Sequence, residues 1–180
     1  MPTRSLVLDG VVFAALVAAA FVSRFAEVAP NFAAVAAAGL FAGFYFRSRA
    51  AAVGVPILAM VLSDPFLGGY PWYQVIAVYG CLALPVVFGR MMNGSASWGR
   101  VAGSSLAASI VFFVVTNFAV WAGGVYGYGP GDLARCYVAA APFFKYTVSG
   151  DLFYAGLFFG VHALVGLGRA ARVPAAALVR

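Results

Sequence analysis

Hydrophobic residues in this chain form long unbroken runs, separated by short polar or proline- and glycine-containing stretches. A bilayer core of about 30 Å requires roughly 20 apolar residues in a straight α-helix. The runs are continuous and alanine-rich, and they lack the alternation of polar and apolar positions that is typical of membrane β-strands. The pattern therefore predicts six helices, at Leu6 to Phe25, Phe32 to Phe46, Ala50 to Ser63, Trp72 to Arg90, Val101 to Ala122 and Val148 to Leu167.

The first of these segments has a second interpretation, as a cleaved signal peptide. Arg4 precedes it, and the run Ala18-Ala19-Ala20 lies where a cleavage site would be expected. However, the apolar stretch is long for a signal peptide, and Asp9 interrupts its start. We therefore interpret the segment as a helix of the mature protein.

Composition supports a membrane protein. The chain has 180 residues, of which 64% are hydrophobic and 9% are charged, whereas soluble domains are roughly half apolar and about a quarter charged. This chain has too few polar side chains to cover a surface in water, which argues against a soluble enzyme or a nucleic-acid-binding module. With 17 Phe and 2 Cys, it resembles neither a disordered chain nor a disulfide-rich scaffold. We predict a single transmembrane domain over residues 1–180.

The net charge of +6 is explained by orientation in a membrane. If the N-terminus is cytoplasmic, the cytoplasmic stretches hold eight basic residues and the external stretches hold three, as the positive-inside rule requires. This places both termini in the cytoplasm and requires no nucleic-acid partner. The cytoplasmic basic residues are Arg4, Arg47, Arg49, Arg90, Arg100, Arg169, Arg172 and Arg180, and the external charged residues are Arg24, Glu27, Asp64, Asp132, Arg135, Lys145 and Asp151.

The second and third segments are short for a membrane span, at about 15 and 14 residues. Their outer ends carry Ala29-Pro30-Asn31 and Ser63-Asp64-Pro65, so these turns should lie below the outer surface. Irregular backbone at that depth is tolerated where it lines a wet cavity, and paired short segments indicate a binding site. We predict an outward-facing pocket lined by Asn31, Asp64 and the stretch from Pro65 to Tyr70. Alternatively, the external loops are simply where polar residues are tolerated.

The link from Gly123 to Thr147 is the longest in the chain. Its first part, Gly123 to Pro130, is rich in glycine and contains Tyr126 and Tyr128, which suits a mobile lid that closes over a pocket. Asp132 is then expected to cap a short helix, Leu133 to Ala141, that ends before Pro142. The alternative is that these tyrosines belong to the aromatic belt at the membrane interface.

Cys81 is the strongest candidate metal ligand. It lies about nine residues into the fourth segment and shares a helix face with Gln74 and Ala77. Pro85 has no N–H, so the carbonyl of Cys81 loses its helical partner and the helix should kink or open there. A thiol beside such a break is a soft-metal ligand. Alternatively, Cys81 is a small buried hydrophobe, or it forms a disulfide with Cys136.

Enzymatic motifs are absent from the sequence. His162 is the single histidine, and it has no metal-ligand spacing around it, so we expect an interior packing role. The chain carries no Walker loop, nucleophile elbow or His-Glu-x-x-His motif. We therefore expect a transporter or binding protein rather than an enzyme.

Three stretches carry a resemblance to a known family. They are Pro30 to Ala33, Gly39 to Gly43 (sequence GLFAG) and Leu62 to Gly68 (sequence LSDPFLG). They resemble the substrate-binding S components of energy-coupling factor transporters, which are small bacterial membrane proteins. Within that group the chain is similar to the solitary S components for vitamin B12 uptake, the BtuM-like family, which have a cysteine in the corresponding helix.

The resemblance implies an S-component-like bundle of six transmembrane helices in the bacterial inner membrane, binding cobalamin from the outer side. Cys81 would be the axial cobalt ligand and would displace an upper ligand such as cyanide. Gln74, Ala77, Asn31, Asp64, Tyr70, Tyr126 and Tyr128, which come from the topology above, would surround the corrinoid. A transmembrane coupling subunit with its ATPases would dock on small residues of the first helix, such as Ala14 and Ala18.

Two other interpretations keep a membrane bundle but change its function. The first is an S-component-like transporter for another vitamin or a precursor, in which Cys81 only packs. The second is a structural or assembly subunit with no small-molecule ligand.

Overall fold

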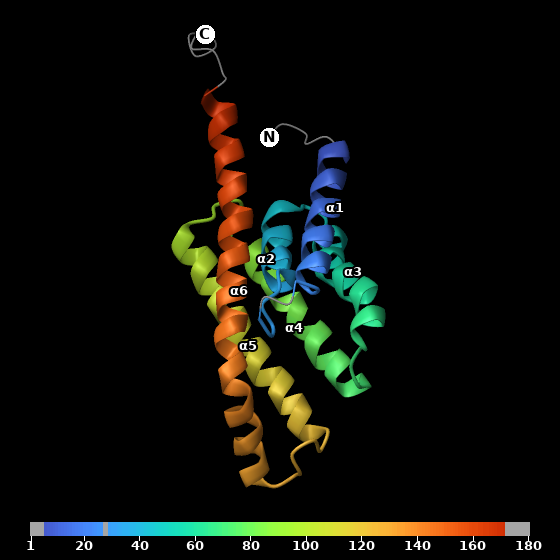
Figure 1. Ribbon diagram of the computed structural model, residues 1–180. Helices are drawn as coiled ribbons and strands as arrows, with labels where there is room; N and C mark the ends of the chain where they lie inside the picture. The colour runs from blue at the N-terminus through green and yellow to red at the C-terminus, as the bar shows by residue number, and fades with distance from the viewer. Residues whose placement is uncertain (1–5, 27–28, 172–180) are drawn as a thin grey trace.

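The computed structural model describes residues 6–26 and 29–171, and this part of the chain is all-helical, without a β-strand. Five of its helices are long and apolar enough to cross a membrane, which indicates a multi-pass membrane protein. The remaining helix, Val35–Tyr45, is shorter. The all-α prediction is thus confirmed. The helices are α1 (Leu6–Ser23), α2 (Val35–Tyr45), α3 (Arg49–Leu67), α4 (Trp72–Met91), α5 (Trp98–Ala122) and α6 (Pro130–Ala171) (Figure 1).

The short helix α2 lies at the centre of the bundle. It has 11 residues, and nine of them are buried. It contacts all five other helices, so its backbone and side chains are covered by protein. This burial explains how a helix too short to span alone is accommodated, and the predicted shortness of the second segment is confirmed.

Glycines allow α2 and α4 to cross at very short range. A Cβ atom added at Gly43 would lie 2.1 Å from the backbone oxygen of Val86, and one added at Gly89 would lie 2.0 Å from the backbone oxygen of Leu40. Both distances are far below van der Waals contact, so neither position accepts a side chain. Close approach through small residues is the usual basis of helix packing in membranes.

The prediction that the third segment ends at Ser63 is wrong. Helix α3 continues through Asp64 and Pro65 to Leu67 and ends at Gly68, which has a φ of 92°. The N–H groups of Gly68 and Gly69 both donate to the Asp64 carbonyl, each at 3.1 Å, and so satisfy the C-terminal turn. With 19 residues, α3 is long enough to cross a membrane.

The predicted break before Pro142 is also wrong, because α6 is one helix over 42 residues with Pro142 inside it. Packing against α5 explains the continuity. Phe113 contacts Tyr137 before the proline and Phe144 after it, with ring centroids 5.7 and 4.8 Å apart. The link between α5 and α6 is therefore residues 123–129 rather than 123–147.

Helix α4 likewise continues through Pro85 to Met91, so it does not open into a loop at Cys81. Helix α1 packs against α2 and α3.

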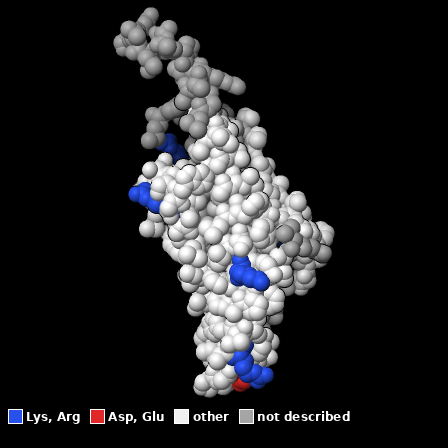
Figure 2. Space-filling model, turned by 60° about the vertical axis from the view of Figure 1, so that its left-hand side comes forward, with Lys and Arg blue, Asp and Glu red and all other residues white. Residues whose placement is uncertain are grey.

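The two ends of the bundle differ. The start of α1 and the end of α6 lie at one end, and the α5–α6 turn lies at the other, where the α5–α6 hairpin extends beyond the other helices (Figure 1). The face in Figure 2 is mostly uncharged, with basic side chains at separated positions along it. Four residues used for the predicted orientation lie outside the described residues, namely Arg4, Glu27, Arg172 and Arg180.

Candidate functional site

A polar cavity lies towards the end of the bundle that carries the α5–α6 turn. Its volume is about 190 Å³, and it lies between the first half of α4, the second half of α5, the first part of α6 and the turn before α2. Apolar side chains such as Phe112 and Phe143 form part of its wall. Its polar lining is formed by Asn31, Tyr70, Gln74, Thr116, Asn117 and Thr147.

Two further cavities adjoin the first, because Asn31 and Tyr70 line all three. One, of about 100 Å³, reaches from Arg24 to Asp151. The other, of about 420 Å³, lies along the turn before α2 and also borders Arg24. The three cavities lie next to one another and share Asn31 and Tyr70, and we call them together the polar region.

The position of Asn31 follows from its local sequence. Pro30 and Asn31 occupy the middle of a four-residue turn, closed by the Phe32 N–H donating to the Ala29 carbonyl at 3.1 Å. Asn31 has a φ of 63°, which asparagine tolerates better than most residues, and the order Pro then Asn suits a type II turn. The turn is held to α1 by Ser23, whose Oγ accepts the Ala34 N–H at 2.8 Å.

Several polar atoms in the cavity have spare hydrogen-bonding capacity. The side-chain amides of Asn31 and Gln74 form no hydrogen bond with any described residue. Asn117 Nδ2 donates to the Phe113 carbonyl at 2.8 Å, which leaves its Oδ1 as an acceptor. Thr116 Oγ1 donates to Phe112 at 2.7 Å and can still accept. The cavity therefore offers both donors and acceptors to a polar ligand.

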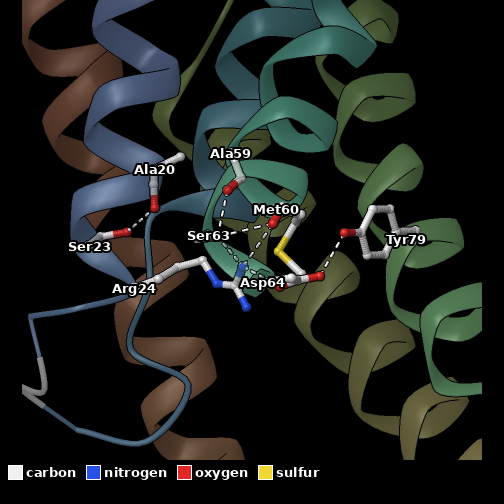
Figure 3. A network of polar contacts seen from close by, with 8 residues as sticks. All are labelled: Ala20, Ser23, Arg24, Ala59, Met60, Ser63, Asp64 and Tyr79. Carbon is white, nitrogen blue, oxygen red and sulfur yellow. Dashed lines mark hydrogen bonds and ion pairs between the residues drawn. The ribbon is translucent and has the colours of Figure 1, made fainter. Parts of the chain in front are cut away.

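Asp64 does not line the cavities but belongs to a buried network at their edge (Figure 3). Arg24 Nη1 lies 2.6 Å from Asp64 Oδ1 and also donates to Ser63 Oγ. On the other side, the Tyr79 hydroxyl donates to Asp64 Oδ2 at 2.7 Å. Asp64 thus joins α1, α3 and α4, and its role in the structure is to hold Arg24 beside the cavities.

Cys81 lies apart from this region. Its thiol is half-buried and free, and neither Cys81 nor Ala77 lines any of the three cavities, although Gln74 and Val78 of the same helix do. Within the described part of the chain, no group of three or more His, Cys, Asp or Glu side chains is arranged to hold a metal ion. A cobalt centre here would have Cys81 as its single thiolate ligand.

The predicted lid residues are exposed and lie away from the cavities. Tyr126 is 36% exposed and Tyr128 is 73% exposed, and neither lines a cavity. Asp132 acts at the start of α6, where its Oδ2 accepts the Gly129 N–H at 3.1 Å. The second cysteine, Cys136, is buried and free, and its Sγ donates to the Asn117 carbonyl at 3.4 Å.

Sequence reasoning missed the polar residues inside the fifth and sixth helices. Thr116, Asn117 and Thr147 line the first cavity, and Asp151 is 5% exposed and hydrogen-bonded to Ser109, although it was counted among the external charges. Polar residues within apolar runs are the signal that identifies such positions. The lone histidine, His162, packs its ring against Phe41, Phe44 and Tyr45 of α2, as an interior histidine should.

Comparison with known proteins gives one assignment. No curated protein and no solved structure matches the chain. A family model described as a family of unknown function, DUF6580, matches residues 5–176. Because the match spans all six helices and every residue that lines the cavities, the chain belongs to the DUF6580 family.

Proposed function

We propose that this protein is a membrane substrate-binding or transport protein whose ligand occupies the polar region around Asn31 and Tyr70. The observation that carries the proposal is the set of three adjoining cavities that these two residues share. Polar side chains inside a membrane bundle are costly and mark substrate pathways. Pockets with apolar walls and a few converging polar groups are the usual form of small-molecule sites.

The finer arrangement that we propose follows from the basic residues. The chain is a six-helix S-component-like bundle in the bacterial inner membrane, with both termini cytoplasmic and the α5–α6 turn external. In that orientation the cavities open towards the outside. A coupling subunit with its ATPases would contact α1, where Ala14 and Ala18 are four residues apart.

Cobalamin is the ligand that the resemblance to S components supports. Corrinoids carry peripheral carboxamides, and the free amides of Asn31 and Gln74 complement such groups. Cys81 would bind cobalt axially, replacing cyanide in cyanocobalamin. A corrinoid is larger than the ligands that fill pockets of about 300–1,000 Å³, and Cys81 lines none of the cavities. Binding would therefore require α4 and the α5–α6 hairpin to separate.

A second candidate ligand is a smaller polar vitamin or precursor. The first cavity, at about 190 Å³, together with its neighbours suits a molecule well below corrinoid size, and such a ligand would need no contact with Cys81. The two candidates differ in their demand on the fold, because only the corrinoid requires the helices to move apart.

The test is equilibrium binding to the full chain in lipid nanodiscs. We expect the protein to retain cyanocobalamin or, if the ligand is a smaller vitamin, one of riboflavin, thiamine and biotin. Gln74→Leu should weaken binding by about fivefold, because one hydrogen bond to the ligand contributes about 1 kcal/mol. Asn31→Gly, which keeps the positive φ of the turn, should do the same.

The matched control is Ile76→Ala on the same helix, since Ile76 is 66% exposed and lines no cavity. Its affinity should equal that of the wild type. If well-folded protein retains none of the four compounds, or if Gln74→Leu and Asn31→Gly bind them as the wild type does, the cavity is not the ligand site.

A further inference from the structure

Asp151 is a buried carboxyl group on α6, at the point where α6 meets α2 and α5. The residue is 5% exposed. Its Oδ2 lies 2.6 Å from the Ser109 Oγ of α5, whereas its Oδ1 has no hydrogen bond with any described residue. The segment before α2 also presses against α6 here, since a Cβ atom at Gly150 would lie 3.1 Å from the Cα of Phe32.

No cation among the described residues forms an ion pair with this carboxyl group. The ion pairs among the described residues are Arg24–Asp64 and Arg135–Asp132. Around Asp151, α2 contributes Ala36, Ala37 and Leu40, and α4 contributes Val78, Leu82 and Pro85. The other titratable or charged side chains that line its two cavities are Arg24 and Tyr70, and Arg24 is already paired. A carboxylate at this place would be an uncompensated charge, which is costly in a protein interior and more so in a membrane.

The hydrogen atoms in the cluster can be counted. Ser109 Oγ lies within hydrogen-bonding distance of two acceptors, Asp151 Oδ2 at 2.6 Å and the Ser105 carbonyl at 3.0 Å. A hydroxyl carries one proton and can donate to only one of them. Both contacts are satisfied together if Asp151 is a carboxylic acid that donates to Ser109 Oγ, while Ser109 donates to the Ser105 carbonyl.

We propose that Asp151 and Ser109 form a proton-binding site, in which Asp151 carries the proton when α5 and α6 are packed together. The ligand of this site is a proton rather than a metal ion, because the three side-chain oxygens of Asp151 and Ser109 are too few to coordinate a hard cation. Asp151 also borders the cavity of about 100 Å³ that contains Asn31 and Tyr70, so water in that cavity provides a route for the proton to enter and leave.

The consequence is a contact between helices that depends on pH. Loss of the proton leaves a negative charge between α2, α5 and α6 with one hydroxyl donor, and this favours an arrangement in which the carboxylate reaches water. The ion pair of Asp64 with Arg24 provides the internal contrast, since that carboxyl group has a cationic partner. The inference does not depend on the proposed function, because the proton site exists without any ligand.

The test is the protonation state of Asp151 in the ligand-free full chain in lipid nanodiscs. The chain has four aspartates, Asp9, Asp64, Asp132 and Asp151, so selective ¹³C labelling of aspartate carboxyls gives few signals in NMR and infrared spectra. At neutral pH we expect a signal of a protonated carboxylic acid that is lost in Asp151→Asn and retained in both Asp9→Asn and Asp64→Asn. In Ser109→Ala the signal should persist with a shifted frequency, because its hydrogen-bond partner is gone.

A second measurement can be made even if Asp151→Asn is less stable than the wild type, because it compares how far each protein's unfolding midpoint shifts with pH. The thermal unfolding midpoint of the wild type should fall from neutral to alkaline pH by more than that of Asp151→Asn, in which an amide replaces the acid and can donate to Ser109. The absence of any protonated carboxyl signal in the wild type at neutral pH would overturn the proposal. Persistence of that signal in Asp151→Asn, or equal midpoint shifts in the two proteins, would do so as well.

Discussion

Arg24 and Asp64 form an ion pair that ties the end of α1 to the last turns of α3. Their side chains are 8% and 15% exposed, and Nη1 and Oδ1 are 2.6 Å apart. Asp64 also accepts the Tyr79 hydroxyl of α4 at 2.7 Å, so three helices meet at one carboxylate (Figure 3). The ordered end of α3 and the wall of the cavities beside Arg24 both depend on this contact.

The first prediction follows from that pair. Asp64→Ala should lower the free energy of unfolding by about 3 kcal/mol or more, because removal of one partner leaves a buried guanidinium without its counter-ion. Thermal unfolding in detergent or nanodiscs measures the change. The double variant Arg24→Met with Asp64→Leu should recover part of the loss, since neither charge then remains.

The control for this prediction is the exposed pair near the start of α6. Arg135 and Asp132 are 3.5 Å apart, and the Arg135 side chain is 75% exposed. Arg135→Ala should change stability by less than about 1 kcal/mol. Equal effects of Asp64→Ala and Arg135→Ala would contradict a supporting role for the Arg24–Asp64 pair.

The second prediction concerns the crossing of α2 and α4. Gly89→Ala should destabilise the fold strongly, because the new Cβ would lie 2.0 Å from the Leu40 carbonyl oxygen and the helices would have to separate. Gly80→Ala is the matched control on the same helix, since a Cβ there meets nothing within 4 Å. We expect Gly80→Ala to unfold at the same temperature as the wild type or slightly higher. A similar loss in both variants would show that close packing at Gly89 is not the cause.

The sequence predicts the helices better than their ends. Apolar runs give all six helices and the shortness of α2, because hydrophobicity over many residues decides whether a segment is helical in a bilayer. The ends at Ser63 and before Pro142 are wrong for a shared reason. A proline weakens a helix locally, but contacts far away in sequence, Arg24 with Asp64 and Phe113 with Phe144, keep each helix continuous.

The sequence predicts the site residues that lie in turns. It does not predict those inside helices, because their exposure depends on how each helix is rotated about its axis. The Pro30-Asn31 turn and Tyr70 beside Gly69 are recognisable from local sequence, and the structure brings both to the cavities. Thr116, Asn117 and Asp151 lie inside helices, and whether such a residue faces lipid or protein depends on packing. Helical spacing places Cys81 on the same face of α4 as Gln74. That spacing does not predict how far along α4 the cavities extend, and Cys81 lines none of them.

The third prediction tests orientation. In a chain without native cysteines, Tyr128→Cys in the α5–α6 turn should react with a membrane-impermeant maleimide added to intact cells, since Tyr128 is 73% exposed. Ser95→Cys, an exposed position in the α4–α5 turn, should react only after permeabilisation. The reverse labelling pattern would contradict cytoplasmic termini and would turn the cavities towards the cytoplasm.

The last prediction concerns Cys81 and separates the two candidate ligands. If cobalamin is the ligand and Cys81 binds its cobalt, Cys81→Ala should change the visible spectrum of the bound corrinoid, because a soft thiolate is lost from the axial position. Cys81→Ser should change it similarly, since a hydroxyl is a harder and weaker donor. Cyanide should be released when cyanocobalamin binds the wild type, and Cys81→Ala should release none.

Cys136→Ala is the control for that experiment. Cys136 is buried against α5, so its replacement removes a packed sulfur and lowers stability without altering the corrinoid spectrum. If cobalamin is retained by Cys81→Ala with an unchanged spectrum, Cys81 is ordinary helix packing and the corrinoid is held by the amides of the cavity alone. If the protein retains a smaller vitamin but not cobalamin, Cys81 binds no metal. Its half-buried thiol then only packs within the bundle, because the smaller vitamin does not contact it.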